Sequence, residues 1–553
     1  MRKNRRRLAG IVLLGMVAAA CGGGDDTSSP SPSQASDPSA TSSESTIDAT
    51  PSESTIDESG PKTGGRLVIG MDAETPGLDP IYSSNGRSGQ TIGSAIYDTL
   101  TAVDASMNVV PFVAESVTPN EDATVWTIEL RENLKFSDGT PLDAEAVKFT
   151  FDRLLEEGAP TASGGGFIKE VRVEGPTTVV IETNEPWAPL PATLAEGGLW
   201  FASPKAVTEL GKDGISASPV GAGPFVLDEW VRDDHMTLVR NPNYFRPEYP
   251  YLDEVEFRPI PDDDARASAL RAGDLDLIFT QSGPVIESFK NDPDYQVFLR
   301  QEGVDTIFLN TAKAPLNDVR VRKALALAID KDRLIKVIWN GIGEPASSAF
   351  PATSPFFAEI GGFDFDLDEA KRLIAEYESE TGTDVKLTLT VRNNTAHQEL
   401  NQVVQSMWAD AGVDATLGDP VDYATSIQTA AAGNFDVLIH LTPGFIDPDT
   451  WMRNLHFSSS PINIPNFEDA DIDAALLTGR RSVALKDRVA AYVDLQNLLA
   501  QNVPVIYLRG NVNAVIAKAN VRGIDTWTLP GGAAGFAENI LHVFEAESLW
   551  IDN

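Results

Sequence analysis

The chain has one cysteine, Cys21, among its 553 residues, and only five histidines. A single cysteine excludes a disulfide framework, so a protein of this length depends on hydrophobic cores for its stability. No two histidines stand four residues apart, the spacing that places two imidazoles on one helix face for a metal ion. We therefore expect neither a metal site built from side chains nor a resident cofactor. The histidines are His235, His397, His440, His456 and His542.

Long apolar runs and catalytic motifs are also missing. After residue 20, no apolar run approaches the roughly 20 residues of a membrane-spanning helix. The sequence contains no nucleophile elbow (G-x-S-x-G), Walker phosphate loop, dinucleotide fingerprint after a strand, or zinc motif H-E-x-x-H. We therefore expect no enzyme activity. With 43 basic against 81 acidic residues and a net charge of −38, nucleic acid is disfavoured as a partner.

The N-terminus has the order of an export signal. Five cationic side chains stand within residues 1–7, an apolar run of 13 residues follows over residues 8–20, and three alanines precede Cys21. The run is too short for an ordinary spanning helix, and small residues before a cysteine suit cleavage and lipidation there. The pattern resembles the bacterial lipoprotein signal, except that Ala18 stands where leucine is most frequent. We predict a signal peptide over residues 1–20 and a palmitate-type anchor on Cys21 at the cell membrane, outside the cytoplasm; the alternative is a plain secretory peptide.

Residues 21–63 are predicted to hold the lipidated cysteine and a disordered tether. They are rich in Ser, Thr, Pro, Asp and Gly, and SESTID occurs twice, at residues 43–48 and 52–57. A flexible coil of this length has a root-mean-square span of roughly 35 Å. An O-glycosylated stalk is an alternative interpretation of the same composition.

The rest of the chain alternates between apolar patterns of period 2 and period 3.6, which is typical of an α/β protein. Its length predicts two large lobes or more. Strands are expected at residues 66–71, 124–130, 177–183, 413–417 and 435–441. Helices are expected at residues 143–158, 318–329, 330–339, 368–380, 396–411 and 423–432. The β-α-β order in the C-terminal half predicts a parallel sheet there.

Several turns and acidic clusters also have structural interpretations. Gly221 and Gly223 of PVGAGPF can take positive φ or admit a close backbone, and Gly139 of SDGT suits a tight turn. The segment PDDD at residues 261–264 is typical of a helix start, with Gly273 at the helix end. For Asp447 and Asp449 both a ligand-binding and a structural role stay open, because they follow a predicted strand end.

Segments along nearly the whole mature chain resemble extracytoplasmic solute-binding proteins, family 5, the oligopeptide, dipeptide and nickel branch that serves ABC importers. The segments run in the family's order, and the most specific is LRENLKFSDGTPLDAEAVKFTFDRL. The others are GGRLVIGMDAETPGLDP, IYDTL, VPFVAESV, PVGAGPFVLDEW, LVRNPNYF, YLDEVEFRPIPDDDARASALRAGDLDLI, FLNTAKAPLNDVRVRKALALAIDKDRLI and DLDEAKRLIAE.

The resemblance implies a two-lobe periplasmic-binding-protein-like fold of type II, cluster C, with an extra subdomain in lobe 1. We predict lobe 1 at residues 64–99, 209–280 and 515–553, the inserted subdomain at residues 100–208, and lobe 2 at residues 281–514. It also implies a monomeric receptor that closes on a small solute, an oligopeptide or dipeptide, and delivers it unchanged to ABC permease subunits. Other members carry sugars, opines or metal chelates.

In peptide-binding members an acidic side chain beyond the strand matching FDVLIHL pairs with the ligand's α-amino group. The matching position here is Gly444, so the chain lacks that anchor, and Asp447 is the candidate to take its role from a shifted loop. Candidate ligand-binding residues follow the predicted strand ends and the crossover. They are Ser83, Ser84, Asn85, Thr280, Gln281, Asp305, Asn310, Thr442, Gly444, Phe445, Asp447 and Trp451. Loop solvation or core packing is the alternative for each. A secreted hydrolase and a surface adhesin or sensor are the rival functions.

Overall fold

The computed structural model describes residues 60–83, 86–156, 167–195, 199–444, 446–536 and 544–552, which belong to one compact unit. The predicted signal peptide, Cys21 and almost all of the tether lie outside the described residues, as do Ser84, Asn85 and Phe445. In the part of the chain that the structure describes, no helix combines the length and the apolar character needed to cross a membrane.

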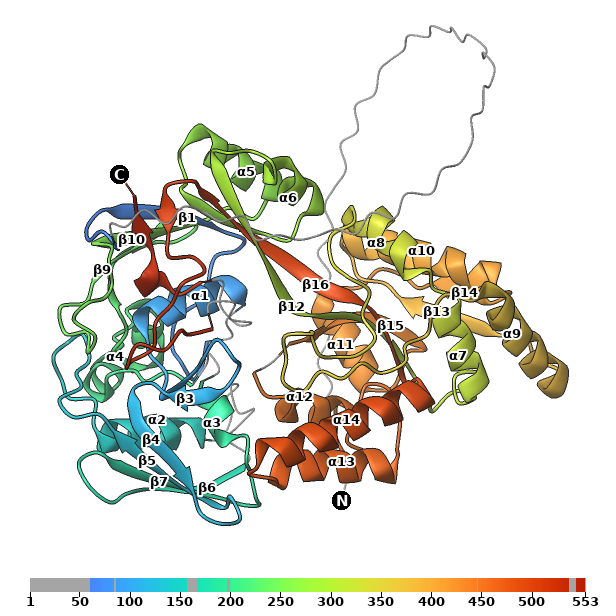
Figure 1. The fold of residues 1–553 in the computed structure, drawn as a ribbon, viewed down its shortest axis with the longest axis horizontal. Helices are drawn as coiled ribbons and strands as arrows, with labels where there is room; N and C mark the ends of the chain where they lie inside the picture. The colour runs from blue at the N-terminus through green and yellow to red at the C-terminus, as the bar shows by residue number, and fades with distance from the viewer. Residues whose placement is uncertain are drawn as a thin grey trace, which may run out of the picture. The chain divides into compact units, whose positions relative to one another are not determined.

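A ten-stranded sheet runs through the whole unit (Figure 1). Its strand order is β14-β13-β15-β12-β16-β11-β1-β10-β9-β8. In that order the strands are β14 (Asp414–Leu417), β13 (Lys386–Thr390), β15 (Val437–Pro443), β12 (Tyr295–Leu309), β16 (Val505–Lys518), β11 (Leu277–Thr280), β1 (Arg66–Met71), β10 (Glu254–Pro259), β9 (His235–Arg240) and β8 (Phe225–Val231).

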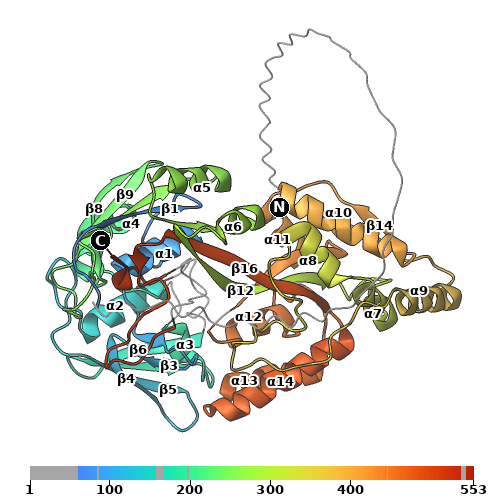
Figure 2. The ribbon, with the colours of Figure 1, turned by 45° about the horizontal axis from the view of Figure 1, so that its top comes forward.

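The two long strands β12 and β16 join the two lobes. They pair antiparallel from Tyr295↔Lys518 to Phe308↔Val505, and the register shifts between Gln301 and Gly303 and again between Asp305 and Thr306. Figures 1 and 2 show both strands crossing from one half of the molecule to the other. We call the half that contains β1–β11 and the C-terminal segment the first lobe, and the half that contains β13–β15 and α7–α14 the second lobe. The residue boundaries given above stay a prediction.

The first lobe contains a second, antiparallel sheet of four strands in the order β4-β5-β7-β6. Its apolar core is shared with the helix α2 and includes Trp126, Phe136 and Phe151. These strands and the short β2-β3 pair are β2 (Thr101–Val103), β3 (Val109–Pro111), β4 (Ala114–Pro119), β5 (Val125–Leu130), β6 (Ile168–Val173) and β7 (Thr178–Thr183). The helices are α1 (Arg87–Ile96), α2 (Ala144–Leu154), α3 (Leu190–Thr193), α4 (Pro204–Ala217), α5 (Asp263–Ala272) and α6 (Gly283–Phe289). The C-terminal segment adds β17 (Val521–Arg522), a 3-10 turn (Ala546–Ser548) and β18 (Trp550–Ile551).

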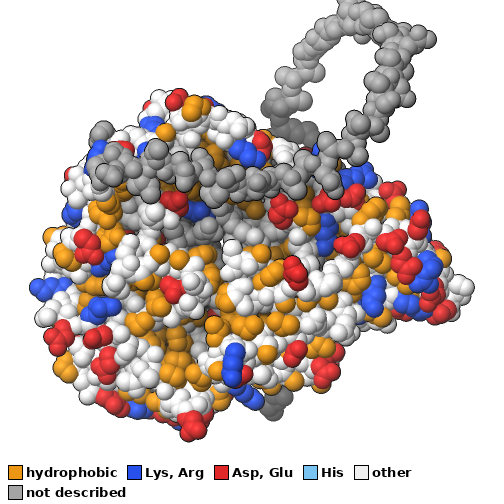
Figure 3. Space-filling model, viewed as in Figure 1, with side chains coloured by type: hydrophobic (Ala, Val, Ile, Leu, Met, Phe, Trp, Pro, Cys, Tyr) orange, Lys and Arg blue, Asp and Glu red, His pale blue; other side chains and the backbone are white. Residues whose placement is uncertain are grey.

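The second lobe packs helices on both faces of its part of the sheet. Alternate residues of β12 enter opposite cores: Ile307 and Leu309 enter one, Val304 and Phe308 the other. The first core includes residues of α7 (Val319–Leu327), α8 (Lys331–Trp339), α9 (Leu367–Thr381) and α10 (Thr395–Asp410). The second includes residues of α11 (Tyr423–Ala431), α12 (Asp449–His456), α13 (Ala470–Arg481) and α14 (Leu485–Asn502), of which α13 and α14 lie side by side (Figure 2). Charged side chains of both signs gather at the α9 end (Figure 3), where Arg372 pairs with Glu369 and Glu376.

Much of the expected local structure is confirmed. β1 has the predicted bounds, and β5 and β7 each start one residue later than predicted. The carboxylates of Asp143, Asp318 and Asp330 cap the N-termini of α2, α7 and α8, respectively. The acidic helix start is α5, capped by Asp262 and ended by Gly273 at φ 87°. The helix end expected at Gly158 is wrong: α2 ends at Leu154, with Leu155 as its C-cap, and Gly158 itself lies outside the described residues.

Three expectations need correction. The C-terminal half is only partly parallel: β13 pairs parallel with β14 and β15, but β15, β12 and β16 pair antiparallel. The strand expected at 435–441 lies at β15, two residues later, so Thr442 is a strand residue. Gly221 and Gly223 are not among the positive-φ glycines; a Cβ at Gly221 would instead lie 2.1 Å from the Ile96 carbonyl oxygen, so only the close approach holds.

Candidate functional site

The loop between β15 and α12 contacts the first lobe through Ile446. This side chain is 5% exposed and packs in an apolar cluster whose other members all come from the first lobe. They are Val103, Met107, Ala192 and Ala195, with Val109 and Phe536 at the edge. The tip of this loop is therefore a point where the two lobes meet.

Arg480, near the end of α13, makes the polar part of the same contact. Its Nη1 donates to Glu185 of the first lobe at 3.1 Å, and its carbonyl oxygen accepts from the backbone N–H of Ala188 at 2.9 Å. Its guanidinium also lies 4.0 Å from the ring centre of Phe167. Within its own lobe, Nη2 donates to Asp449 at 2.6 Å. Arg480 thus links α13 to α12 through Asp449, and links the second lobe to the first through Glu185.

The loop is held by a second buried ion pair. Arg488 of α14 donates to both carboxylate oxygens of Asp447, at 2.5 and 2.6 Å, and Asp447 also accepts from the N–H of Asp449 at 2.9 Å. Although burial opposes the charged guanidinium, Asp447 raises the pKa of Arg488. Burial raises the pKa of Asp449 despite its bonds from Arg480. Both aspartates therefore have their carboxylates engaged inside the second lobe.

The other predicted site residues are spread over the scaffold. Ser83 accepts from the N–H of Asp79 at 2.9 Å. The buried Thr280 donates to Asp263 at 2.5 Å, and Gln281 is exposed. The amide of Asn310 donates to the carbonyls of Gly433 and Phe435. These hydrogen bonds stabilise turns and the ends of strands.

Residues nearer the loop have partners within the sheet and the second lobe. Asp305 accepts from Arg509 at 2.8 Å beside the register shift in β12, and burial raises the pKa of Asp305. Thr442 donates to Thr306 at 3.1 Å, and Trp451 is half-buried against the second-lobe core. Thr442, Gly444, Asp447 and Trp451 are neighbours in the sequence, along the end of β15, the loop after it and the start of α12.

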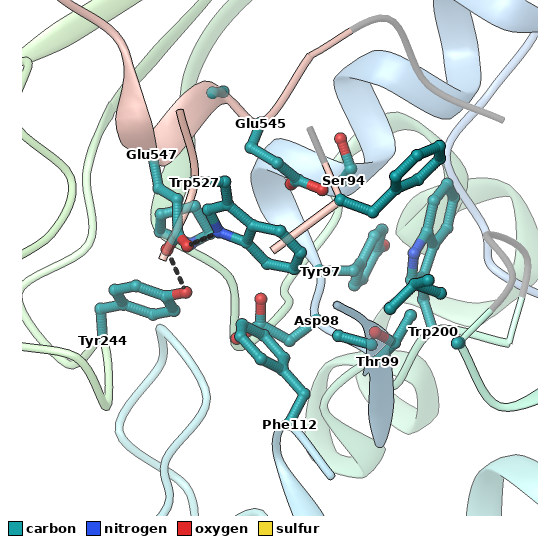
Figure 4. Close-up of a pocket in the computed structure, with 16 residues that line it drawn as sticks. Ser94, Tyr97, Asp98, Thr99, Phe112, Trp200, Tyr244, Trp527, Glu545 and Glu547 are labelled. Carbon is teal, nitrogen blue, oxygen red and sulfur yellow. Dashed lines mark hydrogen bonds between the residues drawn. The ribbon is translucent and has the colours of Figure 1, made fainter. Parts of the chain in front are cut away.

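A pocket of about 40 Å³ lies in the first lobe, directly behind the surface that Ile446 covers. Val103, Ala195 and Phe536 belong both to its wall and to the cluster around Ile446. Figure 4 shows Tyr97 and Trp200 ring against ring on one side and Trp527 on the other. The described lining residues also include three carboxylic acids, Asp98, Glu545 and Glu547.

Two of these acids are buried. Glu547 accepts from Tyr244 at 2.5 Å, Arg246 at 2.7 Å and Trp527 at 2.5 Å (Figure 4 shows the first and third), and burial raises the pKa of Glu547 to about 7. Burial also raises the pKa of Asp98, whose Oδ2 has no hydrogen-bond partner among the described residues.

Sequence reasoning missed the pocket and the contacts between the lobes. Asp98 lies inside the motif IYDTL, which was the available signal, but the motif indicates the family and not the role of the aspartate. Ile446, Arg480 and Glu185 belong to no motif. Among the described residues, no group of three or more His, Cys, Asp or Glu side chains is arranged to hold a metal ion.

Two α/β lobes that are joined by two strands and meet through a loop and an arginine define a two-lobe binding protein. Residues 108–463 match the family model for bacterial extracellular solute-binding proteins, family 5 (middle region), and the chain belongs to this family. Members bind peptides or other small solutes and deliver them to ABC permeases. The fold and family expected from the sequence are confirmed.

The chain is 28% identical over 487 residues to the glutathione-binding protein GsiB of Shigella dysenteriae, which covers 85% of this chain and 94% of the relative. It is 27% identical over 463 residues to the Escherichia coli protein named "Probable D,D-dipeptide-binding periplasmic protein DdpA", and the match covers 80% of this chain and 88% of that relative. Among solved structures, NikA from Brucella suis in complex with Fe(III)-EDTA has a TM-score of 0.77 and 25% identity, with 88% of this chain and all of NikA covered.

Proposed function

We propose that the protein is a lipid-anchored receptor on the outer face of the cell membrane that encloses a short peptide between its lobes and passes it, unaltered, to its ABC permease. The observation that carries this proposal is the meeting of the lobes at Ile446 and Arg480, in front of a pocket in the first lobe. The names of the two sequence relatives support a peptide, since glutathione and a dipeptide are both short peptides.

The contacts between the lobes suit a reversible closure. Ile446 and the Arg480–Glu185 bond join the lobes here, and both would separate if the lobes moved apart on β12 and β16. A ligand that touches both lobes adds its own contacts to the closed form only. Changing the closed-to-open ratio from 1:99 to 99:1 requires about 5.5 kcal/mol of differential binding. A few desolvated hydrogen bonds and one stacked ring provide free energy of that order.

The α-amino group of the peptide has no acidic partner at Gly444, and the Asp447 carboxylate is engaged by Arg488. We therefore propose that recognition depends on backbone groups and on other side chains, with Ser83, Ser84, Asn85, Gln281, Phe445 and Trp451 as candidates. The lack of an acidic partner for an α-amino group also favours a second candidate ligand, a non-peptide solute such as an opine, a sugar or a metal chelate.

Native mass spectrometry of the protein purified from its own host tests the ligand class. Recovery of an intact peptide supports the proposal, and recovery of a non-peptide solute supports the second candidate. Incubation with a peptide mixture tests the rival hydrolase, because fragments that appear with the protein and not with buffer would contradict a receptor that returns its ligand unchanged.

The anchor is tested separately with Cys21→Ser. We expect the unaltered protein to fractionate with membranes and to carry an acyl mass on its first mature residue. The Cys21→Ser protein should lose that mass and leave the membrane fraction. Equal fractionation of both proteins, without an acyl mass, would contradict lipid anchoring and leave the binding function intact.

A further inference from the structure

We propose that the pocket in the first lobe receives the terminal ammonium group of a lysine-like side chain of the captured peptide. This inference rests on the proposed peptide ligand and adds to it a preference for one class of side chain. It is argued from the charge, the unpartnered carboxylate oxygen, the aromatic walls and the size of the pocket.

The pocket has more acidic than basic groups. Asp98, Glu545 and Glu547 line it, and its described lining residues include no lysine, arginine or histidine. Arg246, just behind the wall, donates to Glu547 and is the cation that acts on both Glu547 and Asp98. Because Arg246 already donates to Glu547, the buried Asp98 Oδ2 is left without a donor among the described residues, and the pocket favours either a protonated Asp98 or a bound cation.

Asp98 has a buried carboxylate oxygen that accepts no hydrogen bond from the described residues. The residue is 8% exposed, and its Oδ2 is fully shielded and without a hydrogen-bond partner among the described residues. A buried polar atom left in this state costs free energy that a donor entering the pocket would recover. Glu547, by contrast, already accepts from three donors, so Asp98 is the carboxylate that is left to meet a ligand.

The walls suit an organic cation. Tyr97 and Trp200 stack at 5.6 Å between ring centres with an interplanar angle of 14°, and the Trp527 ring is fixed by its bond to Glu547. Aromatic faces attract ammonium groups and also accept the methylenes next to them. An inorganic metal ion would need a set of oxygen or nitrogen ligands that the described residues do not provide.

Size and position agree with a side-chain terminus. About 40 Å³ corresponds to about three water-sized positions, enough for an ammonium group and one or two methylenes. Val103, Ala195 and Phe536 belong to the pocket wall and also to the cluster in which Ile446 of the second lobe packs, so the pocket lies next to the contact between the lobes. A peptide held where the lobes meet can therefore place a lysine side chain in the pocket.

Calorimetric titration of the unaltered protein with three tripeptides tests the inference: Ala-Lys-Ala, Ala-norleucine-Ala and Ala-(Nε-acetyl-Lys)-Ala. Norleucine lacks the ammonium group, and acetylation neutralises it. We expect Ala-Lys-Ala to bind at least tenfold more tightly than either. Equal affinities for all three would overturn the inference and leave the peptide receptor intact. Binding of none would overturn the proposed peptide ligand, and the inference with it.

The variant Asp98→Asn removes the charge of the unpartnered carboxyl while keeping its shape. We expect it to lose most of the preference for Ala-Lys-Ala over Ala-norleucine-Ala. Asp228→Asn, an exposed carboxylate on β8, is the matched control for net charge and should keep the full preference. A preference retained in Asp98→Asn would overturn the assignment. Because the three-peptide comparison needs only the unaltered protein, the inference stays falsifiable if the variant fails to fold.

Discussion

The guanidinium of Arg480 lies 3.1 Å from the carboxylate of Glu185, which stands 295 positions earlier in the chain and in the other lobe. Arg480 is 1% exposed at its side chain, whereas Glu185 is 33% exposed. The arginine is therefore an inherent part of the second lobe, and the glutamate is the partner that it gains when the lobes meet. The two residues differ accordingly in what their replacement should do.

Glu185→Gln should weaken closure without affecting folding. The substitution removes one partly exposed charge from the contact between the lobes, and Arg480 keeps Asp449. We expect affinity for the bound peptide to fall about two- to fivefold, the scale of a partly exposed ion pair, with an unchanged unfolding midpoint. Titration calorimetry and thermal unfolding measure the two quantities. Glu182→Gln on β7, whose partner Lys169 is in the same lobe, should leave affinity unchanged.

Arg480→Met should destabilise the second lobe. Asp449 is 0% exposed, and without Arg480 its carboxylate would be buried without its main cationic partner. Removing one partner of a buried pair costs about 3–5 kcal/mol, so urea unfolding should show a loss on that scale. The adjacent Arg481 is half exposed, and Arg481→Met should change stability by less than about 0.5 kcal/mol. Similar losses for both variants would contradict the role given to Arg480.

Ile446→Ala should lower affinity more than stability. In the closed form Ile446 is buried against first-lobe side chains, and opening would return it to water. Burial of such a side chain is worth about 1.5–3 kcal/mol, which corresponds to a loss of affinity of about tenfold or more. Ile464 is buried entirely within the second-lobe core, so Ile464→Ala should show the opposite pattern, with lower stability and unchanged affinity. The same pattern in both variants would contradict closure at Ile446.

His456 should make the protein less stable as the pH falls. Burial lowers the pKa of His456 to about 4 from an ordinary 6.5. Above pH 6.5 the imidazole is neutral in both states and contributes nothing. Between pH 6.5 and 4, His456 is protonated in the unfolded chain but stays neutral in the folded protein. Lowering the pH through this interval therefore reduces the free energy of unfolding by up to about 3 kcal/mol.

Urea unfolding at pH 7 and pH 4.5 checks this, with His456→Gln expected to lose less stability than the unaltered protein over that interval. His235 is the control of opposite sign, because its hydrogen bond to Asp234 raises the pKa of His235. His235→Gln should therefore lose more stability than the unaltered protein as the pH falls. A parallel pH response of all three proteins would be evidence against both assignments.

Local structure was predictable where one residue decides it. Asp143, Asp318 and Asp330 cap their helices because a short carboxylate before an amphipathic stripe satisfies free backbone N–H groups. Strand direction was less predictable. The β-α-β order correctly gave the parallel pairs of β13, but β12 and β16 are placed by long-range pairing between residues 295–308 and 505–518, which no local pattern encodes.

The candidate site was predictable only in part. The segment from Thr442 to Trp451 was found because it follows a strand end, yet its two aspartates proved to be bound by Arg480 and Arg488, whose positions depend on α13 and α14. Ile446 and Asp98 were missed, since an isoleucine in a loop and an aspartate in a recurrent motif give no signal of their surroundings. Only the packing shows which of them meets the other lobe and which lines a pocket.

The distance between the lobes, measured with and without ligand, tests the central claim most directly. Spin labels at Glu174→Cys in the first lobe and Val483→Cys in the second, in a Cys21→Ser background, give this distance by electron paramagnetic resonance. We predict a broad distribution without ligand that becomes one short, narrow distance when the recovered peptide is added at saturation. An identical distribution in both states would contradict a receptor that closes on its solute.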